Sequence, residues 1–412
     1  MAEKKERKLY AKKCAKPTQT NINTHKQYKK TLDKIKRTER LNKLKKDFSN
    51  SHGNSKKTWT LIQQSTTKKT KDELSDQFNI DGTITEDKAK IASHLNTYFN
   101  SIGVNLANKT KKANISAESY ANKCKTNLIF KFKKVTNKEI LDTCKKLKPK
   151  SSSGPDGIPS KIIKEIAAEI SKPLTHIVNL SLLTGEIPTE LKESIIKPIF
   201  KDGDKKEASN HRPISLLNAI SKLLEKVIHS QLYQHFSIND LLTNKQFGFL
   251  NKSSCEHAMI SLLSTIEKNK LNGKHTNLTF IDLSKAFDTL NHDILLTKLS
   301  LYGINGTELL WFKNYLLNRQ HSTFFKGTLS EKLSTNTGVP QGSILGPLLF
   351  LIYINDLAEN VNGTLLYADD TTLINEDNDL KELEKKANHT VKTAADWFKA
   401  NKLTLNAKKQ ET

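Results

Sequence analysis

Three aspartates are the residues of this sequence best suited to chemistry. Asp369 and Asp370 are adjacent in the tetrapeptide YADD (367–370), which interrupts an apolar stretch typical of β-structure. Asp282 follows another apolar run, 87 positions earlier. Adjacent carboxylates repel each other, and burying them is costly unless cations neutralise the charge. Three carboxylates at strand ends would suit a pair of Mg²⁺ ions about 3.5–4 Å apart, which serves phosphoryl transfer.

Each carboxylate also has an ordinary structural explanation. Asp-Asp is a common turn sequence, and on turn statistics alone this explanation is favoured for YADD. An aspartate between a strand and a helix often caps the helix, and for Asp282 taken alone this is as good an explanation as a metal role. Mg²⁺ needs only one or two carboxylates besides phosphates and water, so three aspartates suffice if they meet. The chemistry therefore requires Asp282 to lie beside Asp369 and Asp370.

Hydrophobic patterning predicts the elements that position these aspartates. The pattern favours an α+β fold, in which helices cover a small sheet. Short β-rich segments are predicted at 194–200 and 276–283, and a hairpin with a polar tip at 364–374. Helices are predicted at 86–102 with Thr85 as a cap candidate, at 158–170, at 174–183 closed by Gly185 and Pro188, and at 379–400.

A loop rich in glycine and proline, TGVPQGSILGP (337–347), precedes a long apolar run. Three glycines and two prolines would let the backbone approach a flat substrate closely, although a rigid turn before a buried helix explains the same residues. The apolar run at 344–357 is too short to span a bilayer, which needs ~20 residues, and predicts a buried helix.

The charge of the chain points to a polyanionic partner. The 412 residues carry a formal net charge of +24, and residues 1–70 hold 21 Lys and Arg against 5 Asp and Glu, a net +16. Nucleic acid is the commonest partner of such a basic arm. Within it, one side of a helical wheel is apolar and the rest is cationic, so its cations either are merely solvated or contact phosphate. The apolar positions are Tyr28, Leu32, Ile35, Leu41, Leu44 and Phe48.

Other features of composition favour a soluble intracellular protein. The cysteines Cys14, Cys124, Cys144 and Cys255 are scattered, which argues against a zinc knuckle or a disulfide framework. The charged first ten residues lack the apolar core of a secretory signal. Residues 51–55 are predicted to form a linker, and residues 103–127 are predicted to form a loose polar connection.

The ordered motifs resemble those of the reverse transcriptases of non-LTR (LINE-type, jockey-like) retrotransposons. FIDLSKAFD (280–288), TGVPQGSILGP and YADD look like the A, B and C motifs of the polymerase palm. The resemblance covers about residues 128–409 and implies fingers at 128–260 and palm at 261–412, preceded by a basic helical arm at 1–127. Further segments that agree are KSSSGPDGIP (150–159), IIKPIFKDGD (195–204), HRPISLLN (211–218), QFGF (246–249) and WFKANKLTLNAKK (397–409).

The resemblance also implies roles for individual residues. Asp282 and Asp369 would bridge two Mg²⁺ ions, with Mn²⁺ as an alternative, and Asp370 would assist them. Phe287 matches the aromatic residue that excludes a 2′-hydroxyl and thereby favours deoxynucleotides over an RNA product. The remaining assignments are Lys197 and Arg212 for the incoming triphosphate, Gln341 and Gly342 beside the nucleotide and template, and Lys409 as the late lysine thought to protonate pyrophosphate. For Lys197, Arg212 and Lys409 the alternative is a solvated surface cation.

Departures from the family pattern concern the fingers and the chain ends. His211, Leu250 and Cys255 replace the usual Tyr, Arg and Thr in segments expected to contact the template, and Gln410 stands where Thr is common. The chain ends soon after YADD, so the thumb is expected to be absent or truncated.

The function expected from the resemblance is RNA-directed DNA polymerisation. Its partners would be an RNA template, a DNA primer or target, deoxynucleotides and a separate endonuclease, and its location the nucleus. The alternatives are an inactive nucleic-acid-binding remnant and an RNA-dependent RNA polymerase.

Overall fold

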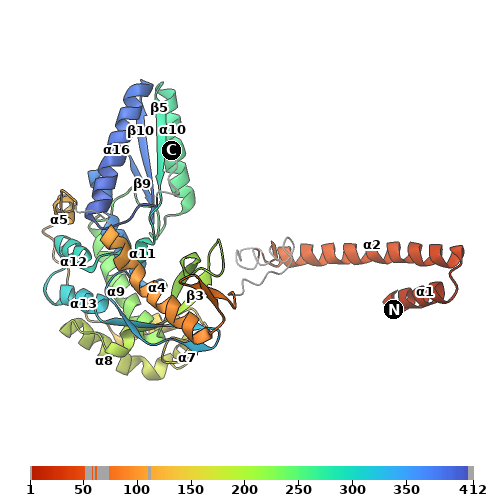
Figure 1. The fold of residues 1–412 in the computed structure, drawn as a ribbon. Helices are drawn as coiled ribbons and strands as arrows, with labels where there is room; N and C mark the ends of the chain where they lie inside the picture. Colours follow the sequence, from red (N-terminus) through yellow and green to blue (C-terminus); the bar gives the residue numbers. More distant parts are fainter. Residues whose placement is uncertain (1, 52–57, 59–60, 63–73, 110–112, 407–412) are drawn as a thin grey trace. The chain divides into compact units, whose positions relative to one another are not determined.

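The computed structural model describes residues 2–51, 58, 61–62, 74–109 and 113–406. The chain divides into two compact units, Met1–Glu73 and Leu74–Thr412 (Figure 1). The predicted division of the second unit into fingers and palm at residue 260 stays a prediction. Among the described residues, no helix is both long and apolar enough to cross a membrane.

The first unit contains a pair of helices, α1 (Ala2–Ala15) and α2 (Gln19–Ser49). Thr18 begins α2, because its side chain accepts a hydrogen bond from the backbone N–H of Asn21. The two helices pack through His25 of α2, whose ring lies 3.1 Å from a carboxylate oxygen of Glu6 and 5.4 Å from the Tyr10 ring. A helix is therefore present where the arm was predicted to be helical, but Ile35 and Leu41 of its predicted apolar side are exposed, and its amphipathic character stays a prediction.

A three-stranded antiparallel sheet carries the YADD sequence. Its strands are β5 (His275–Ile281), β10 (Asp370–Asp377) and β9 (Thr364–Tyr367), with β10 in the centre. Two long helices, α10 (Cys255–Leu271) and α16 (Leu380–Ala400), flank the strands (Figure 1). Asp379 caps α16 by accepting hydrogen bonds from the backbone N–H groups of Lys381 and Glu382. These elements confirm the predicted hairpin and the predicted helix at 379–400.

A second sheet combines strands that are far apart in the sequence. The antiparallel pair β3 (Glu193–Phe200) and β4 (His211–Leu217) continues through a parallel pairing of β3 with β6 (Arg319–Phe325). The short strands β7 (Thr328–Leu329) and β8 (Leu333–Thr335) both pair with β6. Of this sheet only β3 was predicted, and β4, β6, β7 and β8 were not.

The core of the second unit is centred on α14 (Leu345–Ile354), in which every residue except Pro347 is buried. This confirms the buried helix predicted from the apolar run. Around it pack α9 (Ala219–Ile238) and α12 (His292–Leu301), and α13 (Gly306–Leu316) packs on α12. The other helices are α5 (Ala117–Ala121), α6 (Asn137–Lys145), α7 (Ser160–Glu165), α8 (Ala167–Thr184), α11 (Ala286–Thr289) and α15 (Leu357–Asn360).

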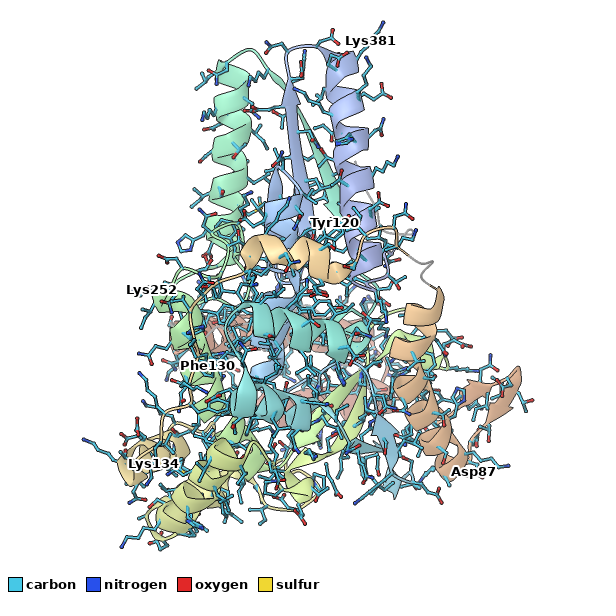
Figure 2. The ribbon with its side chains drawn as sticks, turned by 90° about the vertical axis from the view of Figure 1, so that its left-hand side faces the viewer. Asp87, Tyr120, Phe130, Lys134, Lys252 and Lys381 are labelled. Atoms are coloured by element: carbon cyan, nitrogen blue, oxygen red, sulfur yellow. The ribbon has the colours of Figure 1, made fainter. Side chains whose placement is uncertain are left out.

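Two predictions about the start of the second unit were wrong. Thr85 does not cap α4 (Lys88–Lys109), because it ends a small hairpin of β1 (Phe78–Ile80) and β2 (Thr83–Thr85). Asp87 caps the helix instead, since its carboxylate accepts from the backbone N–H of Ala89 at 2.9 Å. The supposedly loose connection at 103–127 holds the end of α4 and all of α5. The labelled Tyr120 of α5 lies below the sheet in Figure 2, where the helix packs on α12 and α16.

Candidate active site

The strand register brings the three aspartates to one end of the three-stranded sheet. Thr371 of β10 pairs with Ile281 of β5, so the residues that follow in this direction, Asp370 and Asp282, leave the strand pair at the same level. Asp370 also pairs with Tyr367 of β9, which leaves Ala368 and Asp369 as the two-residue tip of the hairpin. In Figure 1 this end of the sheet adjoins α11.

Asp369 is partly buried at this tip and responds to the charges around it. Burial raises the pKa of its carboxyl, and the negative charge of Asp282 raises it further. The positive charges of Arg212 and Lys201 act in the opposite direction. A cation between Asp369 and Asp282 would offset the cost of burying the charged Asp369 carboxylate and the repulsion between the two carboxylates. These carboxylates therefore fit a metal site. They do not form a closed ligand set: among the residues that the structure describes, no group of three or more His, Cys, Asp or Glu side chains is placed to hold a metal ion.

Asp282 is held by the segment that follows α16. The Asn406 side chain donates to Asp282 Oδ2 at 2.9 Å, and the Asn406 backbone N–H donates to the Asp282 carbonyl at 2.9 Å. The backbone N–H of Ser284 donates in turn to the Thr404 carbonyl. The motif WFKANKLTLNAKK therefore has a structural role, because its Asn406 supports Asp282. The sequence alone did not reveal this role. Lys409, at the end of that motif, lies outside the described residues.

Phe287 stands on the turn after Asp282, where α11 begins. Its ring packs against Phe350 of α14, with centroids 4.8 Å apart, and lies 6.1 Å from the Phe249 ring. Lys285, just before it, has a left-handed backbone with φ of 51° and donates to the His211 carbonyl at 3.2 Å. The motif that carries Asp282 is thereby joined to the β3–β4 hairpin.

The loop at 337–347 braces the same turn. Gln341 Nε2 donates to both carboxylate oxygens of Asp288 at 2.8 Å, and the Gln341 carbonyl accepts from the backbone N–H of Ser215 at 2.8 Å. Gly342 has a φ of 121°, and a Cβ there would lie 2.9 Å from the Ser215 carbonyl oxygen. The close approach expected at this glycine is thus made by the backbone of β4. The proximity of Gly342 to a bound substrate stays a prediction.

The two predicted triphosphate ligands share an exposed face of the β3–β4 hairpin. Lys197 pairs with Ile214, and Arg212 pairs with Ile199, so their side chains project from the same side of the strands. Both are exposed. The positive charges of Arg212 and of Lys201 both lower the pKa of Asp369. Sequence reasoning missed Lys201, although it lies in the quoted segment IIKPIFKDGD.

His211 does not occupy a template-contacting position. Its side chain has no exposed surface, its Nδ1 lies 2.9 Å from the Glu207 carbonyl, and its ring packs against Phe78 and Phe200. Burial lowers the pKa of this imidazole. The expected effect of this departure on template contact was therefore wrong: the residue belongs to the interior of the hairpin.

The segment that contains the three-stranded sheet, the aspartates and the braced loop matches one family in sequence. Residues 203–412 match the family described as reverse transcriptase (RNA-dependent DNA polymerase), and the chain belongs to this family.

Several relatives are proteins of mobile elements. The chain is 30% identical over 293 residues to a probable RNA-directed DNA polymerase from transposon BS of Drosophila melanogaster, covering 67% of this chain and 32% of that protein. It is 28% identical to the RNA-directed DNA polymerase from mobile element jockey of Drosophila funebris, over 67% of this chain and 31% of the relative. A Pol polyprotein from retrotransposable element R2 of Popillia japonica is 28% identical, over 68% and 39%. The chain thus spans about a third of the length of these relatives, and the resemblance to non-LTR reverse transcriptases is confirmed.

Proposed function

We propose that this chain is the catalytic core of an RNA-directed DNA polymerase of a non-LTR retrotransposon. The reaction joins the 3′-hydroxyl oxygen of a primer to the α-phosphorus of a deoxynucleotide and releases pyrophosphate. The observation that carries the proposal is the pairing of β10 with both β5 and β9, which brings Asp282 level with the Asp369–Asp370 tip. The polymerase names of the relatives support the same reaction.

Asp282, Asp369 and Asp370 would hold two divalent cations, Mg²⁺ or alternatively Mn²⁺. When bound, the ions supply Lewis acidity for the attacking and leaving oxygens. The protein keeps Asp282 in place through Asn406, and the tight turn at Ala368 fixes Asp369. Lys409 is proposed as the acid that protonates pyrophosphate, on the strength of the family resemblance.

The surrounding residues would bind and select the nucleotide. Lys197 and Arg212 present cations on one face, which suits a triphosphate. Gln341 and Gly342 are proposed beside the nucleotide, with Gln341 also holding Asp288. Phe287 is proposed to exclude the 2′-hydroxyl, because its ring packs against Phe350 and this contact limits the movement of the ring.

The basic arm is proposed to bind the nucleic-acid substrate. The helix α2 carries exposed Lys and Arg residues along its length, and residues 1–70 have a net charge of +16. Such a surface gains affinity for phosphate by releasing counterions. An RNA template, a DNA primer and a separate endonuclease are the proposed partners, and the nucleus is the proposed location.

Primer extension tests this function. The full chain is given poly(rA)/oligo(dT), dTTP and Mg²⁺, and Asp369→Asn is compared with Asp142→Asn, an exposed aspartate on α6 outside the site. Extension should fall at least about 100-fold in Asp369→Asn and remain unchanged in Asp142→Asn, while binding of the primer–template stays the same in both. Binding without extension by the unmodified chain would instead identify a nucleic-acid-binding remnant.

A further inference from the structure

Only Phe249 of the QFGF motif (246–249) enters the site described above, and the first residues of the motif lie directly beside the hairpin that carries Asp369. The backbone N–H of Leu366 donates to the Lys245 carbonyl at 2.8 Å, and the backbone N–H of Phe247 donates to the Leu366 carbonyl at 2.9 Å. Gln246 and Leu366 form a parallel bridge. The motif therefore runs along the outer edge of β9 and reaches the start of the YADD turn.

The side chain of Gln246 binds both backbone polar groups of Ala368. Its Oε1 accepts from the Ala368 N–H at 2.9 Å and from the Gly248 N–H at 2.7 Å. Its Nε2 donates to the Ala368 carbonyl at 3.4 Å. The side chain is buried, with 4% of its surface exposed, so water does not compete for these bonds.

Ala368 needs this support because its backbone is left-handed, with φ of 58°. Residues with a Cβ adopt this conformation at a cost, and they keep it where the surroundings hold them there. Gly248 allows the motif to come close enough, since a Cβ at this position would lie 2.2 Å from the Ala368 nitrogen. Asp369 follows Ala368 directly, so the conformation of Ala368 sets the direction of the Asp369 carboxylate.

We propose that Gln246 is a positioning residue for nucleotide addition, whose carboxamide locks Ala368 in its left-handed conformation and so directs Asp369 toward Asp282. This proposal rests on the proposed polymerase function. A purely structural role would make Gln246 important for stability alone. A positioning role would make Gln246 important for metal binding and for the rate of nucleotide addition.

A second glutamine provides a matched control. Gln231 of α9 holds a backbone in the same way, because its Oε1 accepts from the Lys133 N–H at 2.8 Å and its Nε2 donates to the Lys133 carbonyl at 2.8 Å. Neither of these two hydrogen bonds involves a residue of the candidate active site. Gln246→Met and Gln231→Met therefore remove the same kind of interaction, buried beside Asp369 in one case and exposed elsewhere in the other.

The test measures kcat, the KM for dTTP, the half-saturating Mg²⁺ concentration and the melting temperature of both variants. Gln246→Met should lower kcat at least about 10-fold and raise the half-saturating Mg²⁺ concentration at least about 3-fold, with little change in KM. Gln231→Met should leave kcat and the Mg²⁺ requirement at their original values, and the melting temperatures show how much stability each variant loses. Equal kcat and Mg²⁺ requirement in the two variants would overturn the proposal.

Gln246→Glu decides the matter if Gln246→Met does not fold. A glutamate keeps the length of the side chain and its acceptor for the Ala368 N–H but loses the donor to the Ala368 carbonyl. Its kcat should fall and its Mg²⁺ requirement should rise relative to Gln231→Met; unchanged values would again refute positioning. Absence of extension by the unmodified chain would refute the polymerase function itself, and the role of Gln246 with it, whereas an active chain with an unaffected variant would refute the positioning role alone.

Discussion

Asp288 is expected to make the protein less stable as the pH rises through the mildly acidic range. Burial is the strongest influence on this carboxyl and raises its pKa to about 6 from the ordinary value of 3.8. The hydrogen bonds from Gln341 and the positive charge of Lys285 lower the pKa but do not offset the burial. Replacing the carboxyl by the amide of Asp288→Asn removes the titration and preserves the size of the side chain.

The sign follows from proton binding in the two states. Between about pH 4 and pH 6 the unfolded chain has released this proton and the folded protein still holds it, so the free energy of unfolding falls as pH rises. A difference of about two pKa units corresponds to about 3 kcal/mol. The side chain keeps some solvent exposure, which reduces the expected effect to about 1–3 kcal/mol.

Urea denaturation of Asp288→Asn and the unmodified protein between pH 4.5 and 7.5 measures this effect. The free energy of unfolding of the variant should increase relative to that of the unmodified protein as pH rises to 6. The increase should total about 1–3 kcal/mol and level off at higher pH. Asp142→Asn controls for the change in net charge and should show no such rise. A difference that is constant across this range, or that shrinks with pH, would refute the assignment of a raised pKa to Asp288.

Three further expectations concern selectivity, the arm and the braced loop. Phe287→Val should raise the kcat/KM for a ribonucleotide relative to the matching deoxynucleotide at least about 10-fold, and an unchanged ratio in single-nucleotide extension would exclude Phe287 as the selective group. Deleting residues 1–70 should weaken RNA binding and flatten its dependence on salt, as measured by fluorescence anisotropy at several salt concentrations; an identical slope would show that the arm does not bind RNA. Gly342→Ala should reduce the free energy of unfolding by about 1–3 kcal/mol, because the new Cβ would lie 2.9 Å from the Ser215 oxygen in a left-handed backbone, and equal urea midpoints would contradict this geometry.

Local patterns predicted the elements that carry the aspartates. Alternating apolar residues predicted the β9–β10 hairpin, and the approach of Asp282 to its tip follows from the strand register. Gly185 was correctly expected to end a helix, since it caps α8 with φ of 75°. The hairpin and the helix end depend on residues close together in the chain, which is why sequence reasoning could find them.

Features made by distant segments were beyond the reach of local patterns. The parallel pairing of β3 with β6 joins residues more than a hundred positions apart, and short strands such as β8 carry little periodic signal. The support of Asp282 by Asn406 likewise requires the fold. His211 was expected in a segment that contacts the template, but strand alternation places its side chain on the opposite face from the exposed Arg212, where it is buried.

The central claim is that Asp282 and Asp369 hold the same divalent cations. Electron paramagnetic resonance of Mn²⁺ tests it directly, with the protein bound to a dideoxy-terminated primer–template and the next deoxynucleotide. The unmodified chain should bind two Mn²⁺ ions, and Asp282→Asn and Asp369→Asn should each weaken binding at least about 10-fold, while Asp142→Asn should not. Undiminished Mn²⁺ binding by Asp282→Asn would show that the two aspartates do not share a metal site.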